Sequence, residues 1–371
     1  MNQPKKIPSI LLDIMRLSAA LIVLFVHSKA MWFPNQQHDP KTPHDISHTA
    51  VVLFFVLSGF VIAFTTINKN RGFLQYMEAR LGRLYSIVLP GLLITALCEY
   101  LVAKFDPLLY TTIFKDHVWL RYLISGMFLN EIWFFSSVIP MNGPLWSLGY
   151  EFWYYIIFGC WFFKDKGIKS WFLLIIVIGI AGPKIMIMMP VWIAGFLAYK
   201  VPKPIFKLEL SLLLLFGITV LIILTFGFCP PYPFIIGSHP FFWAGQFVTD
   251  YLMGILFALF FWLLPVKNYI SLTVNTEIIN FFRKVADLTF PIYVFHWPLL
   301  ILYKSVFNFR EANFNQWLSA MTLVLLVSSF LGFWLNKFRP IWDKIFGYLL
   351  LKLKTIHPFF GNWNSRKFLS S

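Results

Sequence analysis

Residues 10–33, ILLDIMRLSAALIVLFVHSKAMWF, form the first long apolar stretch of the chain and decide how the rest is interpreted. The stretch is long enough to cross a bilayer as one helix, which takes about 20 apolar residues. Three ionisable residues interrupt it: Asp13, Arg16 and His27. A charge near the middle of a bilayer costs a few kcal/mol on insertion scales, so such residues are usually paired, face a cavity and have a function.

The spacing of these residues predicts a polar line along one helix. Arg16 and His27 are eleven positions apart, which is about three turns of roughly 3.6 residues, so both side chains project from nearly the same face. At ~1.5 Å per residue they lie roughly 16 Å apart along the axis. Asp13 precedes Arg16 by one turn, and we expect the two to pair. A structural ion pair with an interfacial histidine is the alternative.

The composition identifies an all-α, polytopic integral membrane protein. Of the 371 residues, 58% are hydrophobic and 13% charged, and the mean hydropathy is +0.70, whereas soluble domains carry about 25% charged residues. The net charge of +15 resides between apolar stretches, which indicates membrane topology and not a nucleic-acid partner. Cys98, Cys160 and Cys229 stand apart, so neither a disulfide framework nor a zinc site is predicted.

About ten membrane spans are predicted, with both termini in the cytoplasm. We place them at residues 10–32, 48–67, 86–104, 146–163, 171–182, 185–199, 208–228, 246–265, 286–304 and 316–336. The short fifth and sixth spans flank Gly182-Pro183 and are interpreted as a broken pair or half-spans. In this layout, 22 of the 31 Lys and Arg residues fall on the inner side and eight on the outer side. That asymmetry supports an even number of spans.

The segments between the spans carry further expectations. The outer loop 33–48 contains His38, His44 and His48, but their spacing matches no tight metal site, so no metal is predicted. Segment 105–145 is expected to form helices that lie at or dip into the outer face, and 229–245 could form a lid. We divide the chain into a membrane domain, 1–340, and a basic, aromatic cytoplasmic tail, 341–371, that lies on the inner leaflet.

Two early motifs combine packing and charge. The second span contains FFVLSGF at 54–60, in which Ser58-Gly59 allows close helix approach. Arg80 and Arg83 follow in what we interpret as an inner loop, one turn apart. Such a pair suits a phosphate or pyrophosphate ligand, because guanidinium groups bind these anions with two hydrogen bonds. Anchoring by the positive-inside rule explains the pair equally well.

Two later motifs place ionisable residues among aromatic ones. In residues 142–155, NGPLWSLGYEFWYY, Glu151 is close in sequence to Trp146 and Tyr155. A carboxylate among aromatic side chains can orient a histidine or bind sugar hydroxyls, although an aromatic belt at the membrane interface has the same composition. In residues 288–300, LTFPIYVFHWPLL, His296 lies inside a span and has either a structural or a functional role.

Taken together and in this order, the motifs resemble those of the acyltransferase-3 family of membrane acyltransferases. The resemblance covers nearly the whole length. It is carried by Asp13-Ile-Met-Arg16 with His27, FFVLSGF at 54–60, Arg80-Leu-Gly-Arg83, Trp146-Ser-Leu with Glu151 and Tyr155, and IYVFHWP at 292–298. Each motif alone is weak, whereas five in order with matching topology are specific. Leu17-Ser18 departs from the glycine that many relatives have after the arginine.

The resemblance implies transfer of an acyl group, most often acetyl, from cytoplasmic acyl-CoA to a hydroxyl of a cell-envelope polysaccharide or lipid-linked sugar. It also implies a multi-pass protein of the inner (plasma) membrane. Arg80 and Arg83 would hold the phosphates of coenzyme A, and Arg16 would meet its pantetheine arm or thioester or act structurally with Asp13. Acetyl-CoA is thus expected as the acyl donor, without a metal.

The same resemblance implies roles at the acceptor side. His27 would act as general base on the acceptor hydroxyl, or carry the acyl group as a nucleophile; the base requires fewer steps. Glu151 would orient His27 or the acceptor. Trp146, Tyr155 and His296 would bind the substrate.

Two other classes of protein fit parts of the pattern. A secondary transporter or exporter would also have ten spans, ionisable residues in the membrane and a broken span pair. Against it, no repeat relates two halves of the sequence. A non-catalytic scaffold for glycan assembly would tolerate substitution of Arg16 and His27.

Overall fold

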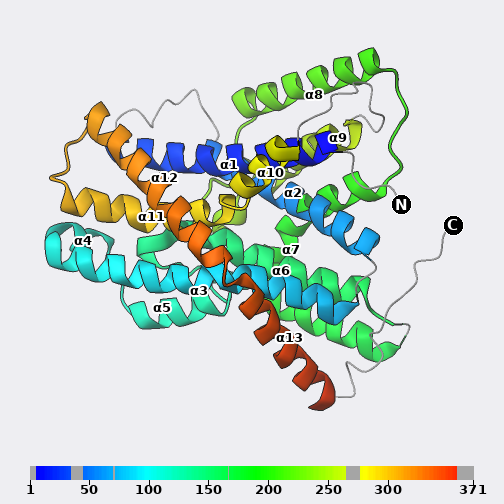
Figure 1. Ribbon diagram of the computed structural model, residues 1–371, viewed down its shortest axis with the longest axis horizontal. Coiled ribbons are helices and arrows are strands. Elements are labelled where there is room, and N and C mark those ends of the chain that lie inside the picture. The colour runs from blue at the N-terminus through cyan, green and yellow to red at the C-terminus, as the bar shows by residue number, and fades with distance from the viewer. Residues whose placement is uncertain (1–5, 35–44, 70–71, 166, 265–275, 357–371) are drawn as a thin grey trace.

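A computed structural model describes residues 6–34, 45–69, 72–165, 167–264 and 276–356, which form helices and no β-strand (Figure 1). The α-helices are α1 (Lys6–Trp32), α2 (Ile46–Lys69), α3 (Phe73–Phe105), α4 (Pro107–Ile113), α5 (Val118–Gly126), α6 (Trp146–Phe162), α7 (Ile168–Lys200), α8 (Leu208–Phe228), α9 (Phe247–Leu263), α10 (Thr276–Ala286), α11 (Thr289–Val306), α12 (Phe314–Asn336) and α13 (Arg339–Ile356). The 3-10 helices η2 (Pro140–Leu145) and η3 (Phe242–Ala244) precede α6 and α9. The predicted all-α class is confirmed.

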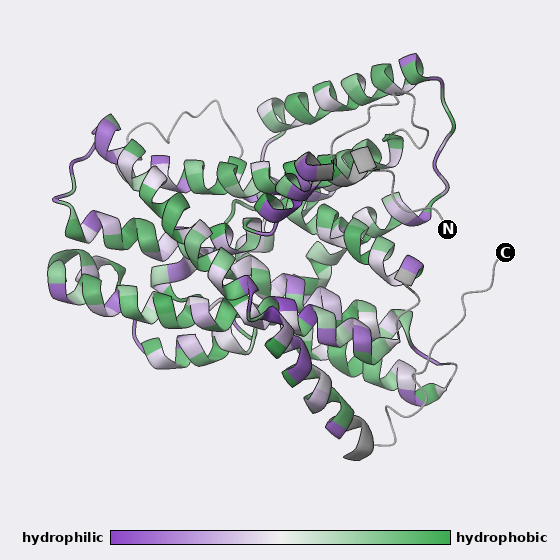
Figure 2. Cartoon of the chain, viewed as in Figure 1, coloured by the Kyte–Doolittle hydropathy of each residue, from purple (hydrophilic) through white to green (hydrophobic). Residues whose placement is uncertain are grey.

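Seven helical segments within the described residues are long and apolar enough to cross a membrane. They are Ile10–Trp32, Ile46–Asn68, Phe73–Phe105, Ile168–Lys200, Leu208–Phe228, Asn280–Val306 and Phe314–Asn336. Hydrophobic residues cover most of these helices, whereas hydrophilic residues are frequent on α10 and α13 (Figure 2). An integral membrane protein with several spans is therefore supported, while ten spans and cytoplasmic termini stay predictions.

Helix α7 contains the interruption predicted at Gly182-Pro183. Gly182 has φ 79° and ψ 178°, which is outside the helical region. Residues at both ends of α7 lie beside the end of α6: Lys164 Nζ is 3.8 Å from the ring centre of Trp171, and the rings of Trp161 and Phe196 are 6.0 Å apart. The two halves of α7 therefore form a hairpin with its tip at Gly182.

A buried ion pair fixes this tip. Lys184 Nζ donates to the Glu131 carboxylate and, at 2.7 Å, to the carbonyl of Phe135. Both charged side chains have 0% exposure. A side chain at Gly182 would place its Cβ 2.6 Å from Cα of Trp133, so the close approach of the two segments requires glycine as much as the positive φ does. Segment 127–139 and the tip of α7 are thus locked together.

Helix α3 corrects one expectation, because it begins at Phe73 and not at residue 86. Tyr76 packs its ring 5.8 Å from Phe158 and 5.5 Å from Phe163, so the first turns of α3 are held against the end of α6. Arg80 and Arg83 consequently lie on a helix and not in a loop. Their charges had suggested an aqueous segment, but tertiary packing decided the helix start.

Helices α2 and α7 approach until their backbones touch. A Cβ on Gly59 would lie 2.0 Å from the carbonyl oxygen of Trp192, and one on Gly195 would lie 1.9 Å from that of Val56. The two glycines therefore allow a contact that any larger residue would prevent. This confirms the predicted close approach at Ser58-Gly59, although the sequence did not identify α7 as the partner.

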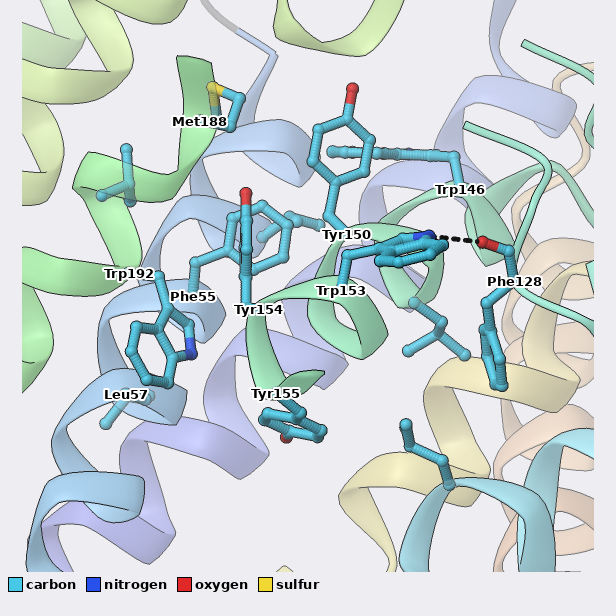
Figure 3. Close-up of a cluster of buried hydrophobic side chains, with 14 of the residues drawn as sticks. Phe55, Leu57, Phe128, Trp146, Tyr150, Trp153, Tyr154, Tyr155, Met188 and Trp192 are labelled. Atoms are coloured by element: carbon cyan, nitrogen blue, oxygen red, sulfur yellow. Dashed lines mark hydrogen bonds between the residues drawn. The ribbon is translucent and has the colours of Figure 1, made fainter. Parts of the chain in front are cut away.

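The core beside this contact is built from the aromatic face of α6. Figure 3 shows Tyr150 and Tyr154 facing Phe55 of α2 and Trp192 of α7, and Trp153 Nε1 donates to the carbonyl of Phe128 at 3.0 Å. The apolar surface of these rings drives the packing of α2, α6 and α7, since every large ring buries much area. Helix α6 thereby becomes a fixed centre from which Trp146 and Glu151 project.

The expected peripheral segments are also present. Helices α4 and α5 form within 105–145, as predicted. Helix α13 packs along α3, where Asp343 lies against Gly82 and the ring of Phe346 is 4.9 Å from that of Tyr85. Residues 357–371 of the predicted tail, and His38 and His44 of the first loop, lie outside the described residues.

Candidate active site

Two cavities lie between the helices, and each collects a different set of polar residues. The first, the arginine cavity, is bounded by α1, α2, α3, α6, α10 and α11; its charged residues are Arg16, Arg80, Arg83 and Glu151. The second, the histidine cavity, is lined by Val23, His27, Asp45, Ser47, His48, Val51, Gly143, Pro144, Trp146, Trp243, Tyr293 and Trp297. Val51 and Tyr293 line both cavities.

Arg80 is held rigidly in the wall of the arginine cavity. Its NH2 group donates to Thr65 Oγ1 at 2.8 Å, and its guanidinium lies 5.9 Å from the ring centre of Tyr155 and 5.8 Å from that of Tyr76. The side chain is buried, yet its Nε has no hydrogen-bond partner in the described part of the chain. A buried guanidinium with an unused donor is prepared for an anionic ligand.

Glu151 is the one acidic residue among those that line the arginine cavity. Ser58 Oγ donates to Glu151 Oε1 at 2.9 Å, and Tyr155 Oη donates to the same oxygen. Ser58 in turn accepts from Trp192 Nε1 at 3.2 Å. Helices α2, α6 and α7 are therefore joined by one hydrogen-bond network, which fixes the carboxylate in the lining of the cavity.

His27 has a defined tautomer because its partner is itself fixed. The Tyr293 carbonyl can only accept, so His296 Nδ1–H donates to it, at 2.6 Å. In the fully buried, neutral His296 ring, Nε2 then has the lone pair and accepts from His27 Nδ1–H at 2.8 Å. In neutral His27 the remaining nitrogen, Nε2, is unprotonated. Because His27 lines the histidine cavity, a basic nitrogen is available there.

Comparison with known proteins places the chain in a family. A family model described as an acyltransferase domain matches residues 10–336. The chain belongs to the acyltransferase-3 family. The resemblance seen in the motifs is thus confirmed, and helix α13 lies beyond the matched region.

Two curated proteins similar to this chain carry related names. The chain is 29% identical over 153 residues to the acyltransferase MdmB of Streptomyces mycarofaciens, over 40% of this chain and 38% of that protein. It is 27% identical over 172 residues to an O-acetyl transferase of Shigella phage Sf6, over 44% of this chain and 49% of that protein. The matches thus span less than half of either relative. No solved structure matches the chain significantly.

The predicted site residues separate into the two cavities. Arg16, Arg80, Arg83, Glu151 and Tyr155 line the arginine cavity, and His27 and Trp146 line the histidine cavity. Glu151 therefore does not contact His27, whose ring partner is His296.

Two predicted residues have surroundings that differ from expectation. His296 has 0% exposure and lies behind His27 instead of lining a cavity. Asp13 and Arg16 are both within the described residues, but no salt bridge joins them. The one-turn spacing of Asp13 and Arg16 permitted a pair, and the side chain of Arg16 instead faces the arginine cavity.

Sequence patterns alone did not indicate several residues of the candidate site. Ser58 was assigned to packing only, and Tyr293, which forms the wall between the cavities, was quoted within a motif without a role. Asp250 was not noticed, although an acidic residue inside an apolar span at 246–265 is the kind of signal that marks a site. His48, its partner, was considered only as part of a polar loop.

Proposed function

We propose that the protein is a membrane O-acyltransferase that moves an acyl group, most simply acetyl, from acyl-CoA to a hydroxyl of a cell-envelope polysaccharide or lipid-linked sugar. The observation that carries the proposal is that an arginine-rich cavity and a histidine cavity meet at one wall, Val51 and Tyr293. Each cavity suits one substrate, and the wall is where the two reacting groups would meet.

The arginine cavity suits the acyl donor. Coenzyme A carries phosphate groups, and guanidinium groups bind phosphates through charge-assisted hydrogen bonds. Arg80 and Arg83, one turn apart on α3, would hold these phosphates near the inner end of the helix, and Arg16 would lie closer to the thioester. Glu151 and Tyr155 would orient the donor from the opposite helix, α6.

His27 supplies the base. Nε2 of His27 accepts the proton of the acceptor hydroxyl while that oxygen attacks the thioester carbonyl carbon. A carbon–oxygen bond forms, the carbon–sulfur bond breaks, and coenzyme A leaves as a thiolate that takes up the proton from His27. His296 keeps the ring oriented throughout, because its own tautomer is fixed by the Tyr293 carbonyl.

The proposal is tested by acetyl transfer in lipid vesicles, with labelled acetyl-CoA and an envelope glycan extract. His27→Asn keeps a donor toward His296 but removes the basic nitrogen. Loss of a general base costs about 100- to 10,000-fold in rate, so the variant should lose glycan-dependent transfer while still binding acetyl-CoA.

His117→Asn is the matched control, because His117 is exposed and has φ 58°, a conformation that asparagine tolerates. It should keep full activity. Full transfer by His27→Asn would contradict the catalytic role, and folded wild-type protein that neither binds nor consumes acyl-CoA would contradict the function itself.

A further inference from the structure

His48, which lines the histidine cavity, forms a buried contact with Asp250 that the reaction described above does not use. His48 Nε2 donates to Asp250 Oδ2 at 3.0 Å, and each side chain is 2% exposed. Gln246 Nε2 donates to the other carboxylate oxygen at 3.0 Å. The carboxylate of Asp250 therefore has two hydrogen-bond partners. The His48 ring, on α2, is held in one orientation by Asp250, which lies on α9.

Two buried polar atoms of this cavity lack a partner within the described residues. They are His48 Nδ1 and Trp297 Nε1. An unpaired buried group is costly, and native proteins rarely keep one without a purpose. Both residues line the same cavity as His27, and the ring of Trp297 stands edge-on to that of His27 at 4.9 Å. The two atoms thus border the place where the base acts.

The chemistry of these atoms selects a hydroxyl-bearing ligand. Trp297 Nε1 can only donate, so it requires an acceptor oxygen. His48 Nδ1 accepts when the ring is neutral and donates when the ring is charged, and a hydroxyl group can satisfy either state. A ligand that presents several neighbouring hydroxyls therefore satisfies both atoms and still offers one hydroxyl to His27 Nε2.

The floor of the cavity is a stack of flat rings. Trp146 lies parallel to His48 at 5.7 Å and parallel to Trp243 at 5.1 Å, with interplanar angles of 10° and 7°. No Lys or Arg is among the described residues that line the cavity, so nothing there favours a phosphate. An uncharged ring fits this surface better than the anionic donor.

We propose that the histidine cavity is a binding subsite for a neutral pyranose ring of the acceptor, positioned by hydrogen bonds to His48 Nδ1 and Trp297 Nε1. The contact with Asp250 holds the His48 ring in place, so His48 and Asp250 act as a positioning pair for an acceptor hydroxyl. This inference rests on the proposed function. It adds that the acceptor presents a pyranose ring and that His48 and Trp297 contact this ring in the histidine cavity.

Two variants test the subsite without breaking the fold. Trp297→Phe keeps the ring beside His27 and removes a donor that has no protein partner. His48→Gln keeps a donor toward Asp250 and removes the atom at the Nδ1 position. With methyl pyranosides and glycan extract as acceptors, each variant should raise the KM for the acceptor about two- to twelvefold, the effect of one hydrogen bond. The KM for acetyl-CoA should stay the same.

The control is Trp119→Phe, since Trp119 is 71% exposed and lines neither cavity; it should leave all constants unchanged. Unchanged acceptor KM values in both test variants would overturn the subsite while leaving the proposed function intact.

Direct binding separates the two proposals further. Tryptophan fluorescence of wild-type protein, titrated with methyl pyranosides in the absence of acetyl-CoA, should show saturable binding that both variants weaken. If wild-type protein consumes no acyl-CoA but binds pyranosides in this way, the subsite stands and the transfer reaction falls. If acceptor-dependent transfer occurs but neither variant alters binding or KM, the subsite falls.

Discussion

The arginine cavity and the histidine cavity share a wall but have opposite chemistry. The first has three guanidinium groups around one carboxylate, and the described lining of the second has neither Lys nor Arg and is dominated by tryptophan and histidine rings. The difference teaches that the charge of the lining residues, more than shape, distinguishes the two cavities. Under the proposed function, an anionic donor would bind on one side of Val51 and Tyr293, and a neutral hydroxylated ring on the other.

Among the variants that compare the two cavities, a larger side chain at their shared wall should lower kcat the most. It would keep the two substrates apart without removing a polar group. Val51→Trp adds bulk where both cavities meet. Displacement of reacting groups by about 1 Å can cost roughly 100-fold in rate, so kcat should fall by at least about that factor while donor and acceptor still bind. Steady-state kinetics and acetyl-CoA binding measure this, and Val51→Ile, a change of one methylene, serves as the control. Normal kcat in Val51→Trp would show that the groups meet elsewhere.

Removing a charge from the arginine cavity should affect the donor alone. Arg80→Gln loses the charge-assisted contact to an anion, which is worth about 1.5–3 kcal/mol. The KM for acetyl-CoA should rise about 10- to 150-fold, with the acceptor KM unchanged. Arg310→Gln, on an exposed loop position, is the control and should have no effect. A rise in the acceptor KM with Arg80→Gln would contradict the assignment of the donor to the arginine cavity and the acceptor to the histidine cavity.

The smallest effect is expected from trimming the network around Glu151. Tyr155→Phe removes one of two donors to Glu151 Oε1 and leaves Ser58 in place. One hydrogen bond is worth about 0.5–1.5 kcal/mol, so kcat/KM for acetyl-CoA should fall about two- to twelvefold, as measured by initial rates. Tyr100→Phe, 65% exposed, should behave as wild type. A change confined to the acceptor KM would place Glu151 with the other substrate.

Local periodicity explains which parts of the site could be predicted from the sequence. Arg16 and His27 are eleven residues apart, and the helical repeat alone turns both toward the interior, where the structure finds one in each cavity. Glu151 and Tyr155 are one turn apart on α6 and share a hydrogen bond for the same reason. A regular helix fixes such relations before any tertiary contact forms.

Relations between distant helices could not be predicted in this way. His48 and Asp250 are 202 positions apart, and His27 and His296 are 269 apart, so no local pattern links either pair. The start of α3 was misplaced because Tyr76 is held by Phe158 and Phe163, and that tertiary packing outweighs the polar sequence around Arg80. No salt bridge joins Asp13 and Arg16 in the structure, although their charges interact, so the expected pairing stays a prediction.

The tip of the α7 hairpin has a consequence for biogenesis. Lys184 lies in the middle of an apolar segment, where inserting a charged lysine costs about 2.5–3.5 kcal/mol. Its partner Glu131 is 53 residues earlier and has already been synthesised when the hairpin emerges from the ribosome. The charge of Lys184 is therefore neutralised by Glu131 only when the hairpin docks onto segment 127–139. For this half of the protein, the order of translation is thus also the order of assembly.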